Sequence, residues 1–510
     1  MTLDAVCTLP LSELIVWVDE VPGSQPEPMS PMAESSCEAF RNTAKRLVDL
    51  GLSYLSLDRA ASTLSTGERQ RTQLARAVRN RTTGVLYVLD EPSIGLHPAN
   101  LEGLTGVMDD LVADGNSVLL VDHDTQVLRH ADHLIEMGPA AGAGGGTVIA
   151  QGPPQALASD PCSQIGPFLY HGDPAVQTGA DAAHLFDLGT IVLDTSAIHT
   201  VQPLHAVFPK GRMTVVTGVS GSGKTTMVLE SLIPAVEDMV KGAPLPGHVR
   251  SVTADGIARI QLIDAAPIGI NIRSTVATYA NVHDELRKIY ARTADAKERG
   301  YKAGDFSYNT GALRCPTCDG TGEINLDVQF LPDVDIPCPD CRGVRYAKAA
   351  FAVKRKGVSL PELMAMSVDE ALEVCADLPI VKSRLQILHD IGLGYLTLGE
   401  ETPGLSGGEA QRLKLASEMG RGQGDTVFVF DEPTIGLHPL DVRTLMDVFR
   451  HLISNGATVI VIEHDLDVIR AADWIVDMGP GGGKDGGRIV ATGTPSQIKS
   501  CPHSVTGRYI

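Results

Sequence analysis

Two segments of this chain repeat each other at a constant spacing of 341 residues, and this repeat limits the folds that the chain can adopt. The run 90–98 (DEPSIGLHP) recurs as 431–439 (DEPTIGLHP), and His123 recurs as His464. About a hundred residues match in this way without a net gap. Because a repeat of this length indicates two copies of one structural unit, we expect a fold built from two related halves.

The two copies differ in their amino-terminal parts. The second copy has a long leader, from about 185 to 350, that has no counterpart in the first. A stretch rich in Gly, Ala and Asp separates the copies and is typical of a linker. The sequence therefore predicts the carboxyl-terminal part of one domain in residues 1–170, a linker in 171–184 and a second, longer domain in 185–510.

Composition limits the partners and the compartment. The net charge of −20 argues against wholesale wrapping by nucleic acid, so any such contact has to come from a local patch. No run approaches the roughly 18 apolar residues that span a bilayer, and the amino terminus lacks the features of a signal peptide. Because five of the nine cysteines are scattered singly, no secreted disulfide framework is expected. We therefore expect a cytoplasmic protein with no membrane partner.

The leader of the second copy contains a phosphate-binding pattern. Residues 218–225 (GVSGSGKT) follow an apolar, β-branched run and precede a helix-like segment, 226–232. In this context backbone N–H groups and a helix N-terminus hold phosphate oxygens. Lys224 is expected to reach the β- and γ-phosphates of ATP, and Thr225 to hold Mg²⁺. The candidate nucleotide-binding residues are Gly218, Ser220, Gly221, Ser222, Gly223, Lys224, Thr225 and Thr226.

An apolar strand pattern, 427–430, ends in two carboxylates. Asp431 is expected to hold Mg²⁺, and Glu432 to polarise an attacking water. Asp90 and Glu91 repeat this pattern in the first copy. The pattern is weak evidence alone, but a P-loop in the same chain makes it an indication of ATP hydrolysis.

Two CxxC pairs, Cys315 with Cys318 and Cys338 with Cys341, are separated by 19 residues. This spacing in a chain that is not secreted is typical of a four-cysteine zinc site, with two disulfides or a redox pair as the alternative. Because four thiolates leave no open position for water, the expected Zn²⁺ is structural. The zinc module is predicted at about 305–347.

A basic stretch follows the second cysteine pair. Residues 342–356 contain six basic side chains and no acidic one, with Tyr346 and Phe351 between them. Such a stretch is either a solvated surface or a nucleic-acid contact. The candidate DNA-binding residues are Arg342, Arg345, Lys354, Arg355 and Lys356.

The run 405–412 (LSGGEAQR) resembles the signature motif of ABC ATPases, and 64–68 (LSTGE) is its counterpart in the first copy. In that family two nucleotide-binding domains stack head to tail, and the signature of one closes over the γ-phosphate held by the other. The resemblance assigns this role to Ser65, Gly67, Ser406 and Gly408. It also makes His464 a switch histidine, since it follows Glu432 by 32 residues, as His123 follows Glu91.

A zinc module between the P-loop and the signature is unusual for an ABC ATPase. Together with the segments 264–269, 277–279 and 330–334, it resembles the A subunit of the bacterial UvrABC nucleotide excision repair system, over nearly the whole chain. The resemblance implies ATP-driven recognition of damaged duplex DNA with low sequence preference, and handover to a partner subunit. It favours DNA binding by the basic stretch, because the family's zinc module lies against the DNA-binding surface.

The sequence departs from that family in three places. The first copy has no P-loop, no zinc module and no counterpart of the domain that docks the B subunit, so we expect one ATP per chain and no direct docking of that subunit. Ala265 stands where the family has a glutamine that senses Mg²⁺, and Thr66 replaces a signature glycine. A gene fragment, a split gene and a reduced paralogue all remain open, as do a homodimer and a separate amino-terminal half.

The sequence thus predicts an α/β protein with two ABC-type P-loop ATPase halves, the first incomplete. The expected activity is ATP hydrolysis coupled to DNA binding in nucleotide excision repair, with no nuclease activity of its own. One alternative is an accessory or drug self-protection protein of the UvrA kind that loads no nuclease, and another is an inactive fragment. A motor subunit of a membrane transporter would fit the ATPase motifs but does not explain the zinc module.

Overall fold

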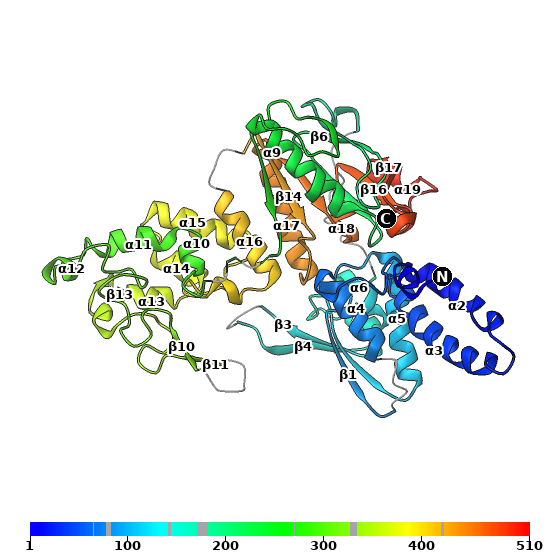
Figure 1. Ribbon diagram of the computed structural model, residues 1–510. Helices are drawn as coiled ribbons and strands as arrows, with labels where there is room; N and C mark the ends of the chain where they lie inside the picture. The colour runs from blue at the N-terminus through cyan, green and yellow to red at the C-terminus, as the bar shows by residue number, and fades with distance from the viewer. Residues whose placement is uncertain are drawn as a thin grey trace. The chain divides into compact units, whose positions relative to one another are not determined.

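The chain forms two compact units in a computed structural model (Figure 1). The first contains Met1–Met137, Val148–Leu262 and Gln423–Ile510, and the second contains Gly138–Thr147 and Ile263–Gly422. The structure describes residues 1–64, 66–77, 83–140, 144–170, 182–266, 268–269, 271–326, 334–419 and 423–510. Residues 171–181 of the expected linker lie outside these ranges, and the division into repeated copies stays a prediction.

A six-stranded sheet forms the core of the first unit. Its strand order is β17-β16-β7-β15-β14-β9, and β7 is parallel to both of its neighbours. The strands are β7 (Met213–Gly218), β9 (Arg259–Ile263), β14 (Thr426–Asp431), β15 (Thr458–Ile462), β16 (Trp474–Gly479) and β17 (Arg488–Gly493). All six residues of β7 are buried, as expected of an apolar strand at the centre of a parallel sheet.

Helices and a second, antiparallel sheet surround this core. The predicted helical segment after the P-loop is a π-helical turn, η5 (Thr226–Leu232), that continues into α9 (Ile233–Lys241). The small sheet has the order β6-β5-β8, with β5 (Thr190–Thr195), β6 (His205–Pro209) and β8 (Val249–Thr253). Helices α17 (Pro439–Ser454), α18 (Leu466–Ala471) and α19 (Pro495–Lys499) complete the second copy's part.

The first copy has fewer described strands. β1 (Leu86–Asp90) pairs in parallel with β2 (Ser117–Val121), and β3 (Leu134–Gly138) pairs with β4 (Thr147–Gly152). The described residues place no strand between β2 and β3, whereas β7 lies between the corresponding β15 and β16. The α-helices here are α1 (Leu3–Cys7), α2 (Leu11–Glu20), α3 (Ser30–Asp49), α4 (Thr66–Ala77), α5 (Pro98–Ala113), α6 (Thr125–His130), α7 (Pro154–Leu157) and α8 (Gly166–Leu169).

Apolar side chains on one face of these strands are exposed, whereas their counterparts in the second copy pack against η5, α9 and the small sheet. Val88 is 62% exposed, whereas Val429, its repeat counterpart, is fully buried. The same contrast holds along the strands, where exposed Leu86, Leu119, Val121, Ile135 and Met137 correspond to buried Val427, Ile460, Ile462, Val476 and Met478. We call the six exposed side chains, Val88 included, the open apolar face.

The second unit is mostly helical and carries a β-hairpin. Its helices are α10 (Val276–Tyr279), α11 (Val282–Tyr290), α12 (Ala294–Glu298), α13 (Leu360–Met364), α14 (Val368–Val374), α15 (Pro379–Asp390) and α16 (Gly407–Glu418). The hairpin pairs β10 (Glu323–Leu326) with β11 (Val334–Pro337), and β12 (Lys354–Arg355) pairs with β13 (Val358–Ser359). Among the described residues, we find no helix with the length and apolar character that crossing a bilayer requires.

Candidate functional site

The P-loop lies at the carboxyl end of β7, where a parallel sheet places its ligands. A Cβ atom on Gly218 would approach the carbonyl oxygen of Met478 to 2.0 Å, so only glycine fits there. Gly218, Gly221 and Gly223 all have positive φ, and this conformation lets the backbone curl. The sequence pattern thus forms the expected strand–loop–helix geometry.

Lys224 is buried inside this loop and is only 6% exposed. Its Nζ donates hydrogen bonds to the carbonyl oxygens of Gly218 (2.8 Å) and Val219 (3.1 Å). Burial lowers the pKa of Lys224, although the nearby carboxylates of Glu432 and Asp431 oppose this effect. The ammonium is therefore held by weak carbonyl acceptors, and a phosphate oxygen would be a stronger partner for it.

Glu432 follows the last residue of β14 in a strained backbone conformation, with φ 45°. Burial raises the pKa of its carboxyl group, and Lys224 partly opposes the rise. His464 Nε2 lies 3.6 Å from Glu432 Oε1. The first copy repeats this geometry, since Glu91 has φ 46° and its Oε1 lies 3.6 Å from His123 Nε2.

Loops of the two copies meet around these carboxylates. Ser220 Oγ donates a hydrogen bond of 3.4 Å to the carbonyl oxygen of Gly95, which belongs to the first copy. A Cβ atom on Gly95 would lie 3.2 Å from Glu432 Oε2, and one on Gly436 would lie 3.2 Å from Glu91 Oε1. Each glutamate therefore faces a glycine of the other copy.

A cavity of about 320 Å³ lies between these loops. It is lined from both copies, with Glu91 and His123 from the first and Glu432 and His464 from the second. The P-loop residues 218–225 do not line this cavity, and the P-loop meets the first copy through Ser220 and Gly95.

Tyr54 is a neighbour of the P-loop that the sequence did not reveal as one. A Cβ atom on Gly221 would lie 3.0 Å from the Tyr54 ring, and Gly482 and Gly483 approach the same side chain. Its hydroxyl donates a 2.5 Å hydrogen bond to Glu68 Oε1 on α4. Tyr54 recurs as Tyr395, but the repeat alone does not say that one copy lies against the P-loop of the other.

The signature motifs begin α4 and α16. Ser65 lies outside the described residues, and Gly67 is in the first turn of α4. Ser406 caps α16 through a reciprocal capping box, in which its Oγ accepts from the Glu409 amide at 3.3 Å and Glu409 Oε2 accepts from the Ser406 amide at 2.8 Å. Gly408 is buried in the first turn of that helix.

The segment around Ala265 is attached to α16. Lys414 Nζ donates to the carbonyl oxygens of Asp264 (3.0 Å) and Ala266 (2.7 Å). Gln411 Nε2 donates to the carbonyl oxygen of Ile263 at 2.9 Å. Ala265 itself lies against Gly407, where a Cβ atom would approach the Ala265 methyl group to 3.3 Å. The residue in place of the expected glutamine thus packs on the signature helix.

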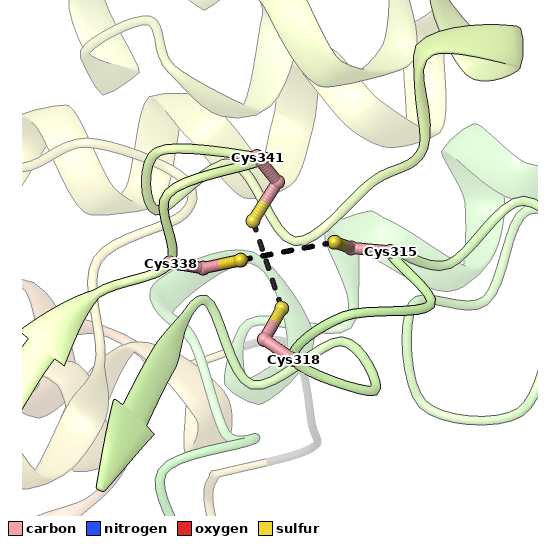
Figure 2. A group of neighbouring side chains, drawn as sticks. All are labelled: Cys315, Cys318, Cys338 and Cys341. Atoms are coloured by element: carbon pink, nitrogen blue, oxygen red, sulfur yellow. Dashed lines mark hydrogen bonds between the residues drawn. The ribbon is translucent and has the colours of Figure 1, made fainter. Parts of the chain in front are cut away.

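The four predicted cysteine ligands converge in the second unit (Figure 2). Cys315 Sγ and Cys338 Sγ are 3.9 Å apart, Cys318 Sγ and Cys341 Sγ are 3.6 Å apart, and all four atoms lie within 4.8 Å of one another. Four thiolates around one Zn²⁺ at about 2.3 Å would be about 3.8 Å apart, so the cluster fits a tetrahedral ion.

Both cysteine pairs use the same backbone turn. Asp319 (φ 51°) and Arg342 (φ 52°) each follow the second cysteine of a pair and adopt the left-handed conformation. The glycine that follows each, Gly320 and Gly343, also has positive φ. The amide of Gly322 donates to Cys318 Sγ at 3.3 Å, which is the kind of interaction that stabilises a thiolate ligand.

Arg345 is buried rather than exposed for nucleic acid. Its side chain is 4% exposed, Nη2 pairs with Glu401 Oε1 at 2.5 Å, and Cζ lies 5.3 Å from the centre of the Tyr308 ring. Its carbonyl oxygen accepts from the Cys315 amide at 2.9 Å. Arg345 therefore joins the cysteine cluster to the helical part of the unit, a role that the basic pattern did not reveal.

Two other basic candidates share one carboxylate. Arg355 Nη2 and Lys356 Nζ lie 2.5 and 2.9 Å from Asp377 Oδ2. Hydrogen bonds from these two side chains lower the pKa of Asp377 to about 2. Lys354 lies 3.9 Å from Glu362 and is exposed, as are Arg342 and Lys348. In the described part of the chain we find no ion pair for Arg342 or Lys348.

The P-loop in its parallel sheet, the strand ending in Asp-Glu and the repeated second copy define an ABC-type P-loop ATPase fold. No protein-family model matches the chain. UvrABC system protein A of Bacillus subtilis is 44% identical over 468 residues, which are 90% of this chain and 48% of that protein. The Thermus thermophilus protein of that name is 41% identical over 508 residues, or 99% of this chain and 53% of that protein.

A solved structure has the same fold over the full chain. The crystal structure of UvrA2 from Deinococcus radiodurans matches with a TM-score of 0.90 and 40% identity, covering 100% of this chain and 63% of that one. Over the region that it shares with these proteins, the chain belongs to the UvrA family. It spans about half the length of the curated relatives that it matches.

Proposed function

We propose that this chain binds and hydrolyses ATP and uses the nucleotide to control binding to damaged duplex DNA, as a cytoplasmic participant in nucleotide excision repair. The observation that carries the proposal is Lys224, whose buried ammonium donates to two backbone carbonyl oxygens inside a glycine-rich loop. The relatives that the chain matches are named UvrABC system protein A, and this similarity supports a role in that system.

The nucleotide site is assigned as follows. The amides of the P-loop and Lys224 hold the phosphates, while Thr225 and Asp431 hold Mg²⁺, which neutralises charge on the phosphates. Glu432 accepts a proton from the attacking water, and His464, beside it at 3.6 Å, orients the γ-phosphate. Thr226 begins the helical segment whose N-terminus faces the loop.

The signature residues close such sites in trans. Ser65 comes directly before α4 in the sequence and Gly67 lies in its first turn. Both belong to the copy whose Gly95 and Tyr54 contact the P-loop. Ser406 and Gly408 would close a site on another P-loop, supplied by a homodimer partner or by a separate amino-terminal half. Direct docking of the B subunit is not part of the proposal.

The cysteine cluster is proposed to hold one structural Zn²⁺ through Cys315, Cys318, Cys338 and Cys341. The sulfur separations and the amide donated to Cys318 support this assignment. When bound, the ion fixes the two turns relative to each other, and its binding free energy contributes to folding.

DNA binding is assigned to the exposed basic side chains beside this cluster. Arg342 and Lys348 are exposed, and Lys354 Nζ lies 3.9 Å from Glu362 Oε1, a long distance for an ion pair. These three side chains are therefore the better candidates for binding phosphates. Arg355 and Lys356 would have to exchange Asp377 for a phosphate, and Arg345 supports the fold of the module.

An ATPase assay with and without damaged duplex DNA tests the proposal. We expect slow turnover by the chain alone, a change of at least severalfold on adding damaged duplex, and no turnover in Lys224→Ala. An ATP turnover rate that does not change when damaged duplex DNA is added would favour the accessory or self-protection role. Absence of nucleotide binding in the wild-type chain would reject the ATPase assignment.

A further inference from the structure

The carboxyl-terminal segment touches the first copy through a chain of buried hydrogen bonds. His97 Nε2 lies 3.0 Å from Thr506 Oγ1, and Thr506 Oγ1 donates to Asp477 Oδ1 at 3.0 Å. Ser504 Oγ donates to the other oxygen of Asp477 at 2.6 Å. His97, Thr506 and Asp477 are at most 2% exposed. Residues 409 positions apart in the sequence are thus joined away from solvent.

The donor and the acceptor of each hydrogen bond in this series follow from the contacts of His97. His97 Nδ1 accepts a hydrogen bond from the Ala99 amide at 3.2 Å, because His97 is the N-cap of α5. Burial lowers the pKa of His97 to about 3, so the ring is neutral and its one proton is on Nε2. Nε2 therefore donates to Thr506, whose own proton goes to Asp477.

This series of hydrogen bonds ends at His97, next to the proposed catalytic residues. The rings of His97 and His464 are in edge contact, with centroids 5.8 Å apart and planes at 86°. His464 Nε2 is 3.6 Å from Glu432, and in the described residues its Nδ1 has no hydrogen-bond partner. The orientation of the His464 ring thus depends on packing, and the His97 ring is the aromatic group that packs on it.

The repeat provides an internal comparison. His438 is the counterpart of His97 and likewise caps its helix, with Nδ1 accepting from the Leu440 amide at 3.2 Å. Ile165 stands at the position of Thr506, so no hydroxyl is present to accept from His438. Glu136, the counterpart of Asp477, instead accepts from Ser163 Oγ and the amide of Ile165. Comparing these two described sites, the His97–Thr506–Asp477 series is present in the one near Lys224, and the first copy has a different set of hydrogen bonds.

We propose that Thr506 and Asp477 form a brace that holds His97 against His464, and that Thr506 and His97 are positioning residues for ATP hydrolysis. The inference rests on the proposed function of the P-loop site. Thr506 touches none of the P-loop residues in the hydrogen bonds described, so removal of its hydroxyl should leave phosphate binding intact. It should loosen the orientation of His464 and slow the chemical step.

Replacing Thr506 by Val and by Ser separates this role from a merely structural one. Thr506→Val keeps the shape and removes the hydroxyl, and we expect kcat to fall about tenfold while the Kd for ATP changes less than about twofold. Thr506→Ser restores the hydroxyl and should restore kcat. Ile165→Val places the same residue at the corresponding position of the first copy and should leave kcat unchanged.

A second measurement reads the brace directly. In protein labelled with ¹⁵N-histidine, the His97 Nε2 proton should exchange slowly with water in the wild type and Thr506→Ser and rapidly in Thr506→Val. If Thr506→Val does not fold, Asp477→Asn should give changes in the same direction, because the amide has one acceptor oxygen for Ser504 and Thr506 where the carboxylate has two. Wild-type kcat in a folded Thr506→Val, or a His97 proton on Nδ1, would overturn the proposal. A wild-type chain that does not hydrolyse ATP would reject the proposed function, and the exchange measurement would still decide the brace.

Discussion

Lys224 and Glu432 have different assigned roles at the proposed nucleotide site, and replacing them should have different effects. Lys224→Ala removes the buried ammonium and should abolish nucleotide binding. Glu432→Gln keeps the size of the side chain and should retain ATP while lowering kcat by about 10²–10⁴-fold. Calorimetry for binding and phosphate release for turnover separate the two effects.

Glu91→Gln is the matched control, because Glu91 repeats the backbone conformation and histidine neighbour of Glu432 without a P-loop in its own copy. It should change turnover little. A large drop in turnover in this variant would show that Glu91 acts in hydrolysis.

The raised pKa of Glu432 predicts a pH dependence. A proton-accepting carboxylate must be ionised, and burial makes this carboxyl group lose its proton at a higher pH than usual. We expect kcat/KM to rise with pH until Glu432 is ionised, and to fall about tenfold per unit on the acid side. The ordinary pKa of glutamate is about 4.3, and the measured midpoint should lie clearly above that value.

Two substitutions of carboxyl groups check the origin of this profile. Glu432→Asp should shift the midpoint, since it changes the burial of the carboxyl group, whereas Asp90→Asn in the first copy should not. A midpoint at the ordinary glutamate value would mean that Glu432 is hydrated in the working enzyme.

At the scale of structural elements, the zinc module offers the sharpest test. Cys338→Ser replaces a fully buried ligand and should remove the metal and unfold the turns, because ion binding and folding are coupled. Elemental analysis should find one zinc per wild-type chain and almost none in the variant. Cys501→Ser, a cysteine outside the cluster, should keep its zinc. Zinc-free protein purified without chelator would contradict the assignment.

The basic stretch beside the module gives an element-scale prediction for DNA. Arg342→Ala combined with Lys348→Ala should weaken binding to duplex DNA and reduce the slope of log K against log salt by about 0.9 for each phosphate that the variant no longer neutralises. Arg355→Ala removes a charge that is already paired with Asp377 and should change the slope less. Fluorescence anisotropy over a range of salt concentrations provides both slopes, and equal slopes in all variants would place the DNA elsewhere.

The parts of the site that sequence reasoning predicted depend on local spacing. The P-loop, the strand ending in Asp431 and the four cysteines form with the expected geometry, because each pattern specifies a single turn or strand end. The burial of Arg345 was missed, because the number of charges along a segment does not show that Glu401 and Tyr308 lie beside it.

The packing between the copies was missed for a different reason. The packing of Tyr54 on Gly221 and the hydrogen bond between His97 and Thr506 join residues far apart in sequence. A repeat shows which residues correspond, but the way in which corresponding halves meet depends on tertiary packing. Hence Tyr54 and Tyr395 have the same local hydrogen bond to a glutamate, and only the structure shows the P-loop next to Tyr54.

At the scale of the whole molecule, the open apolar face and the net charge of −20 act against each other in solution. Like charges keep molecules apart at low ionic strength, while apolar strand surfaces attract each other at short range. Adding salt screens the repulsion, with a Debye length of about 10 Å at 0.1 M and about 3 Å at 1 M, and leaves the attraction. Self-association of the chain should therefore strengthen with salt, whereas its binding to DNA should weaken. Light scattering across a salt series distinguishes association through the apolar surface from association through charges.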